Sequence, residues 1–255
     1  MVFAVDIGNT NIVVGAFDDS GIVFTERLST APRSAEIEYT VLLRTVLGLH
    51  GMEQTAFSGC ILSSVVPPVT QTMRKALLHT VGKEPLIVGA GIRTGLKIHV
   101  DDPAALGSDR VADAVAAAQL YPLPVITVDM GTATTVSVVD SSRTFIGGLI
   151  IPGVRVALSS LSSRASQLPE IGLEPPRRVI GANTADCMKS GIIYSTASAV
   201  DGIADRIEAE LNEPCTVVAT GGNAPLIIPF CKRNIILDDQ LLLKGLMFIY
   251  RKNQT

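Results

Sequence analysis

The chain has 255 residues, enough for one large domain or for two domains of about 125 residues each. Hydrophobic residues make up 47% of the sequence and charged residues 18%, so a substantial core can form. The formal net charge is −3, no block of Lys or Arg stands out, and aromatic residues are only 4%. Nucleic acid is therefore not expected as a partner, because its binding needs a basic surface and, for single strands, stacking aromatic side chains.

The cysteines and histidines argue against a bound transition metal. Four Cys and three His are dispersed along the chain, without a Cys-x-x-Cys pair, so a zinc or iron–sulfur site is not expected. The Cys residues lie in apolar stretches, as is typical of buried thiols in a reducing cytosol. The N-terminus shows no secretory signal pattern, and no stretch reaches the ~20 apolar residues that cross a membrane. We expect a cytoplasmic protein that does not bind a membrane.

The first half of the chain predicts three strands followed by alternating helices and strands. Apolar runs separated by turn residues predict strands at Val2–Asp6, Ile12–Phe17 and Ile22–Leu28. The elements predicted next are a helix with Ser34 as its N-cap, a strand at Phe57–Ser63, a helix from the Pro67-Pro68 pair to about Leu78, and a strand at Leu86–Val88.

An Ala-rich helix, Val111 to Leu120, precedes the second half, which repeats the strand triplet. Its strands are predicted at Val125–Asp129, Thr134–Val139 and Thr144–Ile150. The elements that follow are a helix through Leu161, a long helix over about Thr184–Leu211, a strand at Thr216–Ala219, a helix around Ala224–Cys231, a strand at Ile235–Leu237 and a last helix from Gln240 to Tyr250.

This order of elements predicts an α/β fold made of two duplicated halves. Each half is expected to be a mixed β-sheet flanked by helices, with a cleft between the halves. Tyr121-Pro122-Leu123-Pro124 interrupts any helix and lies between the two strand triplets. We therefore predict an N-terminal half at residues 1–120 and a C-terminal half at residues 121–255.

The first strand of each triplet ends in a similar polar turn. The first turn is Asp6-Ile7-Gly8-Asn9-Thr10-Asn11 and the second is Asp129-Met130-Gly131-Thr132-Ala133-Thr134. A glycine lets the backbone bend sharply and approach a ligand, and tight turns present N–H groups to anions. An Asp at the strand end can hold a cation that bridges to phosphate oxygens. The pair of turns predicts a polyphosphate site shared by two related halves; the alternative is two ordinary hairpins with polar tips.

A third polar segment, Gly107-Ser108-Asp109-Arg110, lies between the two turns in sequence. Asp109 precedes the Ala-rich helix, where a carboxylate complements the positive end of the helix dipole. A carboxylate is also the usual group that accepts a proton from an alcohol in phosphoryl transfer. Arg110 suits a bidentate contact with a carboxylate or a phosphate, and its alternative is an ordinary surface position.

Together these segments resemble the motifs of the type III pantothenate kinases, in the same order and along essentially the whole chain. The motifs are the two turns, Gly107 to Arg110, Gly147-Gly148-x-Ile150-x-Pro152-Gly153, Gly181-x-x-Thr184 with Gly191, and Thr220-Gly221-Gly222. That family belongs to the superfamily of acetate and sugar kinases, actin and heat-shock chaperone ATPases. The resemblance implies two ribonuclease-H-like halves and ATP-dependent phosphorylation of pantothenate to 4′-phosphopantothenate, the first step of coenzyme A biosynthesis.

The resemblance also implies site residues, cofactors and an assembly. It assigns Asp109 as the catalytic proton acceptor, with pantothenate bound by Gly107, Ser108, Asp109, Arg110 and Thr184. The implied ATP-binding residues are Asp6, Ile7, Gly8, Asn9, Thr10, Asn11, Ile12, Val13 and Thr132. Asp6 is expected near Mg²⁺, through water, and Asp129 is expected to bind a monovalent cation, K⁺ or NH₄⁺. Gly221 and Gly222 are expected either near the adenosine or in a plain strand-to-helix turn. Family members are homodimers.

One segment departs from the family pattern. The family often has a Tyr-Asp-Asn-Pro-like stretch whose Tyr touches the substrate, and this chain has Val100-Asp101-Asp102-Pro103. Val100 cannot supply a phenolic hydrogen bond. Two other function classes stay open: another small-molecule kinase of the same superfamily, and a non-catalytic accessory or regulatory relative.

Overall fold

The computed structural model describes residues 1–254, which form two compact units. Unit 1 contains residues 1–95, residues 101–116 and, from the far end of the described chain, residues 240–254. Unit 2 contains residues 96–100 and 117–239. Because the units are discontinuous along the chain, no single cut separates them, and the division into residues 1–120 and 121–255 stays a prediction.

Unit 1 is built on a five-stranded mixed sheet with the strand order β3-β2-β1-β4-β5. Strands β1, β2 and β3 are antiparallel neighbours, whereas β4 and β5 continue the sheet in parallel. The strands are β1 (Val2–Ile7), β2 (Asn11–Phe17), β3 (Ile22–Ser29), β4 (Gly59–Ser64) and β5 (Pro85–Ile87). All six residues of β1 are buried, as expected for a strand covered on both faces.

The two faces of this sheet pack against different helices. Alternate residues such as Phe3, Val5 and Ile7 join one core with helices α1 (Glu36–Leu49) and α2 (Pro67–Val81). The opposite face meets helix α7 (Leu241–Lys252): Phe17 and Tyr250 pack edge to face at a centroid distance of 5.9 Å. The two-residue alternation of a strand explains why neighbours in sequence belong to different layers.

Unit 2 repeats this topology with the strand order β11-β10-β7-β8-β9-β6. Strands β7, β8 and β9 are antiparallel neighbours; β10 and β11 extend the sheet in parallel beyond β7, and β6 lies parallel to β9. The strands are β6 (Lys97–Ile98), β7 (Val125–Met130), β8 (Ala133–Val139), β9 (Thr144–Pro152), β10 (Thr216–Thr220) and β11 (Ile236–Leu237). The shared antiparallel triplet with a parallel extension confirms two mixed sheets of related topology.

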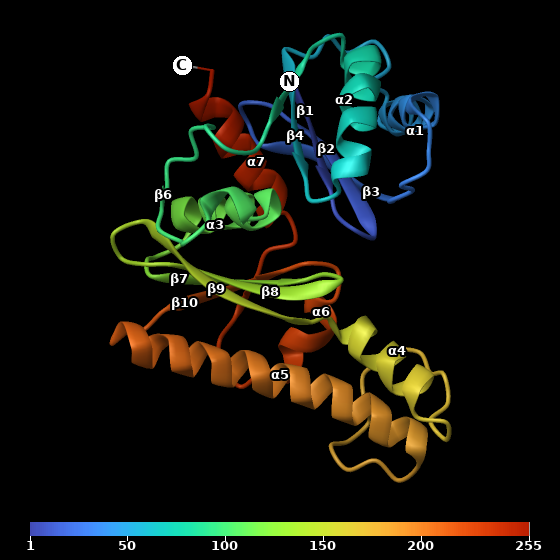
Figure 1. Ribbon diagram of the computed structural model, residues 1–255, viewed down its shortest axis with the longest axis vertical. Helices are drawn as coiled ribbons and strands as arrows, with labels where there is room; N and C mark the ends of the chain where they lie inside the picture. Colours follow the sequence, from blue (N-terminus) through green and yellow to red (C-terminus); the bar gives the residue numbers. More distant parts are fainter. Residues whose placement is uncertain (255) are drawn as a thin grey trace. The chain divides into compact units, whose positions relative to one another are not determined.

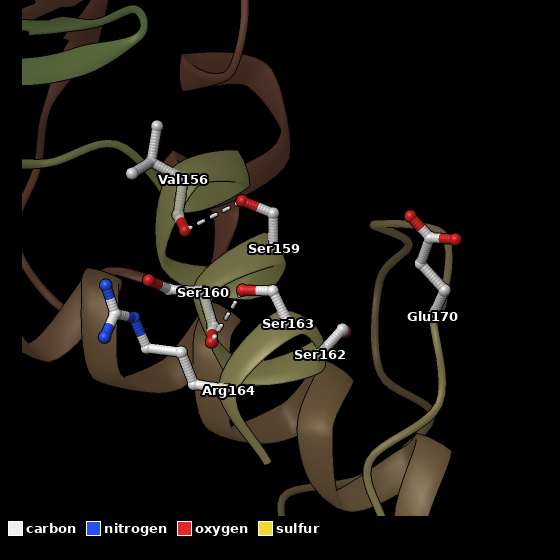
Figure 2. A pocket seen from close by; sticks show the side chains of 7 residues that line it. All are labelled: Val156, Ser159, Ser160, Ser162, Ser163, Arg164 and Glu170. Carbon is white, nitrogen blue, oxygen red and sulfur yellow. Dashed lines mark hydrogen bonds between the residues drawn. The ribbon is translucent and has the colours of Figure 1, made fainter. Parts of the chain in front are cut away.

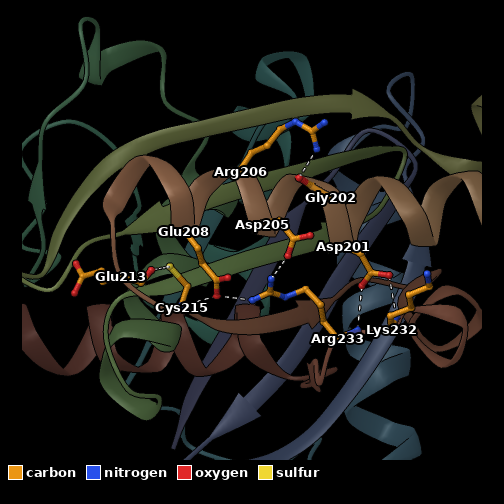
Figure 3. Close-up of polar contacts among 9 residues, drawn as sticks. All are labelled: Asp201, Gly202, Asp205, Arg206, Glu208, Glu213, Cys215, Lys232 and Arg233. Atoms are coloured by element: carbon orange, nitrogen blue, oxygen red, sulfur yellow. Dashed lines mark hydrogen bonds and ion pairs between the residues drawn. The ribbon is translucent and has the colours of Figure 1, made fainter.

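The longest helix, α5 (Thr184–Leu211), lies along one face of the unit 2 sheet (Figure 1). Its buried residues Ile193, Ala197 and Val200 join the core formed by β7, β8 and β10. A polar network holds the loop before β11 against the exposed side of α5 (Figure 3). In it Arg233 forms ion pairs with Asp205 and Glu208, while Asp201 accepts the backbone N–H groups of Lys232 and Arg233.

The remaining helices are shorter than α5, and one of them, α3 (Ser108–Leu120), contributes residues to both units. The others are α4 (Val154–Arg164), α6 (Ala224–Ile227) and the 3₁₀ turns η1 (Pro103–Ala105) and η2 (Ile228–Phe230). Nowhere in residues 1–254 does a helix combine the length and the apolar character needed to span a membrane.

Two sequence-based details were wrong. Helix α1 begins after Ala35 rather than Ser34, because the Glu38 carboxylate reaches back and accepts the Ala35 N–H at 2.5 Å. The helix expected around Ala224–Cys231 is one α-turn followed by one 3₁₀ turn, since Pro229 has no N–H to continue the α-helical hydrogen bonds.

Candidate functional site

The first polar turn joins β1 to β2 in unit 1. Gly8 N–H donates to the Asn11 carbonyl at 3.0 Å, and the Thr30 hydroxyl donates to the Gly8 carbonyl at 2.7 Å. These bonds hold both ends of the turn, while Asn9, Thr10 and Asn11 are exposed. The turn is therefore a fixed backbone that presents small amide and hydroxyl side chains to solvent.

A buried network lies directly behind this turn. Asp6, near the end of β1, is 6% exposed, and its Oδ1 accepts the Ser63 hydroxyl at 2.6 Å. Ser63 Oγ also lies 2.9 Å from Ser108 Oγ, which accepts the Ser64 N–H at 3.1 Å. Ser108 is the first residue of α3, so the network links the ends of β1 and β4 to the start of that helix.

Asp109 occupies the first turn of α3, next to this network. Its Oδ1 accepts the Arg110 N–H at 2.7 Å. A Cβ atom at position 107 would collide with the same oxygen, so Gly107 makes room for the carboxylate. Burial raises the pKa of Asp109, and the Arg110 N–H and guanidinium oppose that rise. A half-buried carboxylate of raised pKa beside an arginine is suited to accept a proton.

The second polar turn, in unit 2, joins β7 to β8 and is packed more tightly. Gly131 N–H donates to the Ala133 carbonyl at 3.1 Å, and Thr132 at the tip is exposed. A Cβ on Gly153 would lie 2.7 Å from the Gly131 carbonyl oxygen. A Cβ on Gly221 would collide with Asp129 Oδ1 and lie 2.6 Å from Met130 N. Two glycines from other segments thus let the backbone close around the Asp129 turn.

The family model and the curated relatives point to the same family. The model of the type III pantothenate kinase family matches residues 2–206. The type III pantothenate kinase of Halalkalibacterium halodurans is 40% identical over 253 residues, which cover 99% of this chain and 100% of the relative. The enzyme of the same name from an Exiguobacterium species is 41% identical over 254 residues and 100% of both chains. The chain belongs to the type III pantothenate kinase family.

Solved structures agree on the fold. The ROK family glucokinase of Streptomyces griseus, solved with glucose and AMPPNP, has a TM-score of 0.55 at 15% identity and covers 100% of this chain and 99% of its own. This likeness shows that the protein shares the fold of that glucokinase. The predicted family, the α/β fold class and the kinase activity are confirmed.

The predicted site residues fall into both units. Asp6 to Val13 and Gly107 to Arg110 belong to unit 1, whereas Asp129, Thr132 and Thr184 belong to unit 2. Within unit 1 the network brings Asp6 close to Ser108 and the start of α3. Thr184 is the exposed first residue of α5, after an Asn183 N-cap whose Oδ1 accepts the Asp186 N–H at 2.9 Å. Their functional roles stay predictions.

Sequence reasoning missed two residues of these networks. Ser63 ends an apolar strand as part of a Ser-Ser pair, and that pair was its only signal. Asn223 is 8% exposed; its side chain donates to the Met130 and Gly131 carbonyls at 3.1 and 3.3 Å and accepts Arg155 Nε at 3.1 Å. Asn223 therefore fixes the second turn, although it lies far away in sequence.

Two surface cavities contain none of the predicted site residues. One, of about 470 Å³, lies beside α4 and is lined mainly by serines, with Arg164 and Glu170 (Figure 2). There the Ser159 and Ser163 hydroxyls bond to carbonyls of their own helix. The other, of about 350 Å³, lies between β9 and α5 and is bordered by the Gly147-Gly148 motif. Val100 is half-buried in unit 2, just after β6.

Proposed function

We propose that this protein transfers the terminal phosphoryl group of ATP to the primary hydroxyl of pantothenate, with Asp109 as the proton acceptor. The product is 4′-phosphopantothenate, the first intermediate on the route to coenzyme A. The observation that carries the mechanism is the half-buried Asp109 carboxylate of raised pKa, one residue from a network that ends on Asp6. Family membership supports the choice of substrate.

Asp109 orients the hydroxyl and removes its proton. Phosphoryl transfer depends mainly on positioning and on charge stabilisation, so a base held in one orientation contributes by aligning the attacking oxygen. The bond from Arg110 N–H leaves Asp109 Oδ1 fixed against the backbone. We assign the pantothenate contacts to Gly107, Ser108, Asp109, Arg110 and Thr184. The Arg110 guanidinium suits the pantothenate carboxylate.

The residues around Asp6 fit a magnesium ion that is held largely by phosphate. Mg²⁺ prefers oxygen ligands, keeps several waters and commonly uses only one or two carboxylates beside substrate phosphates. Asp6 offers a carboxylate beside two serine hydroxyls, and within residues 1–254 no cluster of three or more His, Cys, Asp or Glu could hold a metal ion alone. Bound Mg²⁺ would neutralise charge on the terminal phosphates. Residues Asp6 to Val13 and Thr132 bind the nucleotide.

Asp129 fits a monovalent cation, which we assign as K⁺ or NH₄⁺. Its carboxylate lies against Gly221, where no Cβ would fit, and near Gly131 of the second turn. A carboxylate is an oxygen ligand, the kind that hard cations prefer. We further propose that the protein acts in the cytoplasm as a homodimer.

The first experiment measures ATP consumption with and without pantothenate, at low and high K⁺. We expect turnover that needs both pantothenate and K⁺, because Asp129 would supply a required cation site. Turnover with a sugar in place of pantothenate would favour another small-molecule kinase. No pantothenate-dependent ATP consumption at either K⁺ concentration would favour an accessory protein. Equal turnover at both K⁺ concentrations would reject the cation assignment alone.

A further inference from the structure

Ser63 connects two segments to which the proposed mechanism gives different tasks. It is fully buried on β4, and no substrate or cofactor contact is assigned to it. We propose that Ser63 is a positioning residue of the phosphoryl-transfer site. Its hydroxyl orients the Asp6 carboxylate toward the proposed Mg²⁺ position and connects that carboxylate, through Ser108, to the start of α3. This inference rests on the proposed function, because it assigns the Ser63 hydroxyl a task in that reaction.

The parallel pairing of β1 and β4 explains why this serine reaches Asp6. Asp6 and Ser63 are register partners, so their side chains leave the sheet on the same face. That face is opposite to the core that contains Val5 and Ile7. A short polar side chain at position 63 therefore meets the carboxylate directly, at 2.6 Å, whereas a longer residue would displace it.

The direction of the hydrogen bonds follows from the groups present. A carboxylate oxygen only accepts, so the single Ser63 hydroxyl proton goes to Asp6 Oδ1. The single Ser108 hydroxyl proton can then go either to Ser63 Oγ, 2.9 Å away, or to the Ser64 carbonyl, 3.2 Å away. The Ser63 proton therefore has a defined acceptor, and its bond to Oδ1 holds the carboxylate in one rotation about the Cβ–Cγ bond.

The network therefore connects Asp6, next to the proposed Mg²⁺ position, to Asp109, the proposed proton acceptor. Ser108 is the first residue of α3 and Asp109 is the second, so any shift at Ser108 moves the Asp109 backbone. Hydrogen bonds to ionised groups are stronger than neutral ones, and a buried polar group that loses its partner is costly. Removal of one buried hydroxyl should therefore disturb Asp6 first, and Asp109 through Ser108.

The decisive variant is Ser63→Ala, compared with Thr40→Val. Thr40 also has a buried hydroxyl in unit 1, which donates to the Glu36 carbonyl within α1 and is far from the network in sequence. We expect Ser63→Ala to raise the half-saturating Mg²⁺ concentration about tenfold and to lower kcat, with KM for pantothenate within about twofold. Thr40→Val should leave all three values at the wild-type level.

A second readout does not require turnover. ADP with Mg²⁺ should raise the melting temperature of the wild type and of Thr40→Val more than ADP with EDTA does. We expect this Mg²⁺-dependent part of the increase to be largely lost in Ser63→Ala, while the part seen with EDTA is kept. Ser63→Thr, which keeps the hydroxyl, should retain more of the Mg²⁺-dependent part than Ser63→Ala.

Unchanged Mg²⁺ dependence in a folded Ser63→Ala protein would overturn the inference. If that variant does not fold, Ser108→Ala replaces it and should show the same Mg²⁺ effect at smaller size. A wild-type protein without pantothenate turnover would refute the proposed function instead, and the ADP melting test would still decide the role of Ser63.

Discussion

At the scale of single residues, Asp109 combines a functional advantage with a cost in stability. Its pKa is raised chiefly by burial, so the folded protein disfavours the ionised form that a proton acceptor needs. Such a carboxyl stabilises the fold below its unfolded pKa and loses that contribution as pH rises through its folded pKa. At neutral pH the ionised, half-buried carboxylate is therefore a destabilising group that Arg110 only partly compensates.

Asp109→Asn should separate activity from stability. We expect turnover to fall by roughly 10²–10⁴-fold, because the general base is lost. The melting temperature at about pH 7 should be equal to or higher than that of the wild type. Any excess should shrink as pH falls, because the raised pKa lets the native carboxyl take up its proton at a higher pH than an ordinary Asp does. Asp19→Asn, at an exposed turn, should change neither property. Near wild-type turnover in folded Asp109→Asn would refute the base assignment.

At the scale of elements, the second turn depends on glycines contributed by other segments. Gly221 has φ +90°, and its Cβ would also lie 2.6 Å from Met130 N. Gly91 has nearly the same φ, +87°, but a Cβ there would meet nothing within 4 Å. Comparing an Ala substitution at Gly221 with one at Gly91 therefore separates the cost of the backbone conformation from the cost of crowding the Asp129 turn.

Gly221→Ala should therefore lower both the stability and the K⁺ affinity of the protein more than Gly91→Ala does. Both variants carry a left-handed backbone cost of about 1–2 kcal/mol, and crowding adds about 1–3 kcal/mol at position 221 only. Urea unfolding measures the difference. The K⁺ concentration for half-maximal rate should rise in Gly221→Ala and stay unchanged in Gly91→Ala. Equal destabilisation of the two variants would show that the Asp129 turn tolerates the extra methyl group.

The elements that sequence reasoning predicted well are those with strong local patterns. The strand triplets, the long α5 helix and the turns at Asp6 and Asp129 follow from apolar runs and turn residues. Strand β6 was missed because two residues, Lys97 and Ile98, carry no periodic pattern. Ser63 and Asn223 were missed because their roles depend on partners that β-sheet register and tertiary packing bring together, which a local pattern cannot show.

At the scale of the whole molecule, unit 1 needs both ends of the chain. Helix α7 packs on the β1–β2 face that α1 and α2 leave open, and Tyr250 lies so close to Gly59 that no Cβ fits there. Helix α7 also meets α3, the helix that begins with Ser108 and Asp109. The C-terminal segment thus supports the element that positions the proposed base, although more than a hundred residues of unit 2 separate them in sequence.

Gly245→Ala tests this support. A Cβ on Gly245 would lie 2.5 Å from the Ala112 carbonyl carbon, and collide with its oxygen, so α7 and α3 would have to separate. We expect a net loss of about 1–3 kcal/mol in the free energy of unfolding, despite the higher helix propensity of Ala. Gly191→Ala, in α5 with nothing within 4 Å of its Cβ, should instead gain about 0.5–1 kcal/mol. Helix propensity favours Ala over Gly at both positions, so changes of opposite sign in the free energy of unfolding would locate the cost in the α3–α7 contact. Stabilisation of similar size in both variants would mean that α7 can move away from α3 without loss.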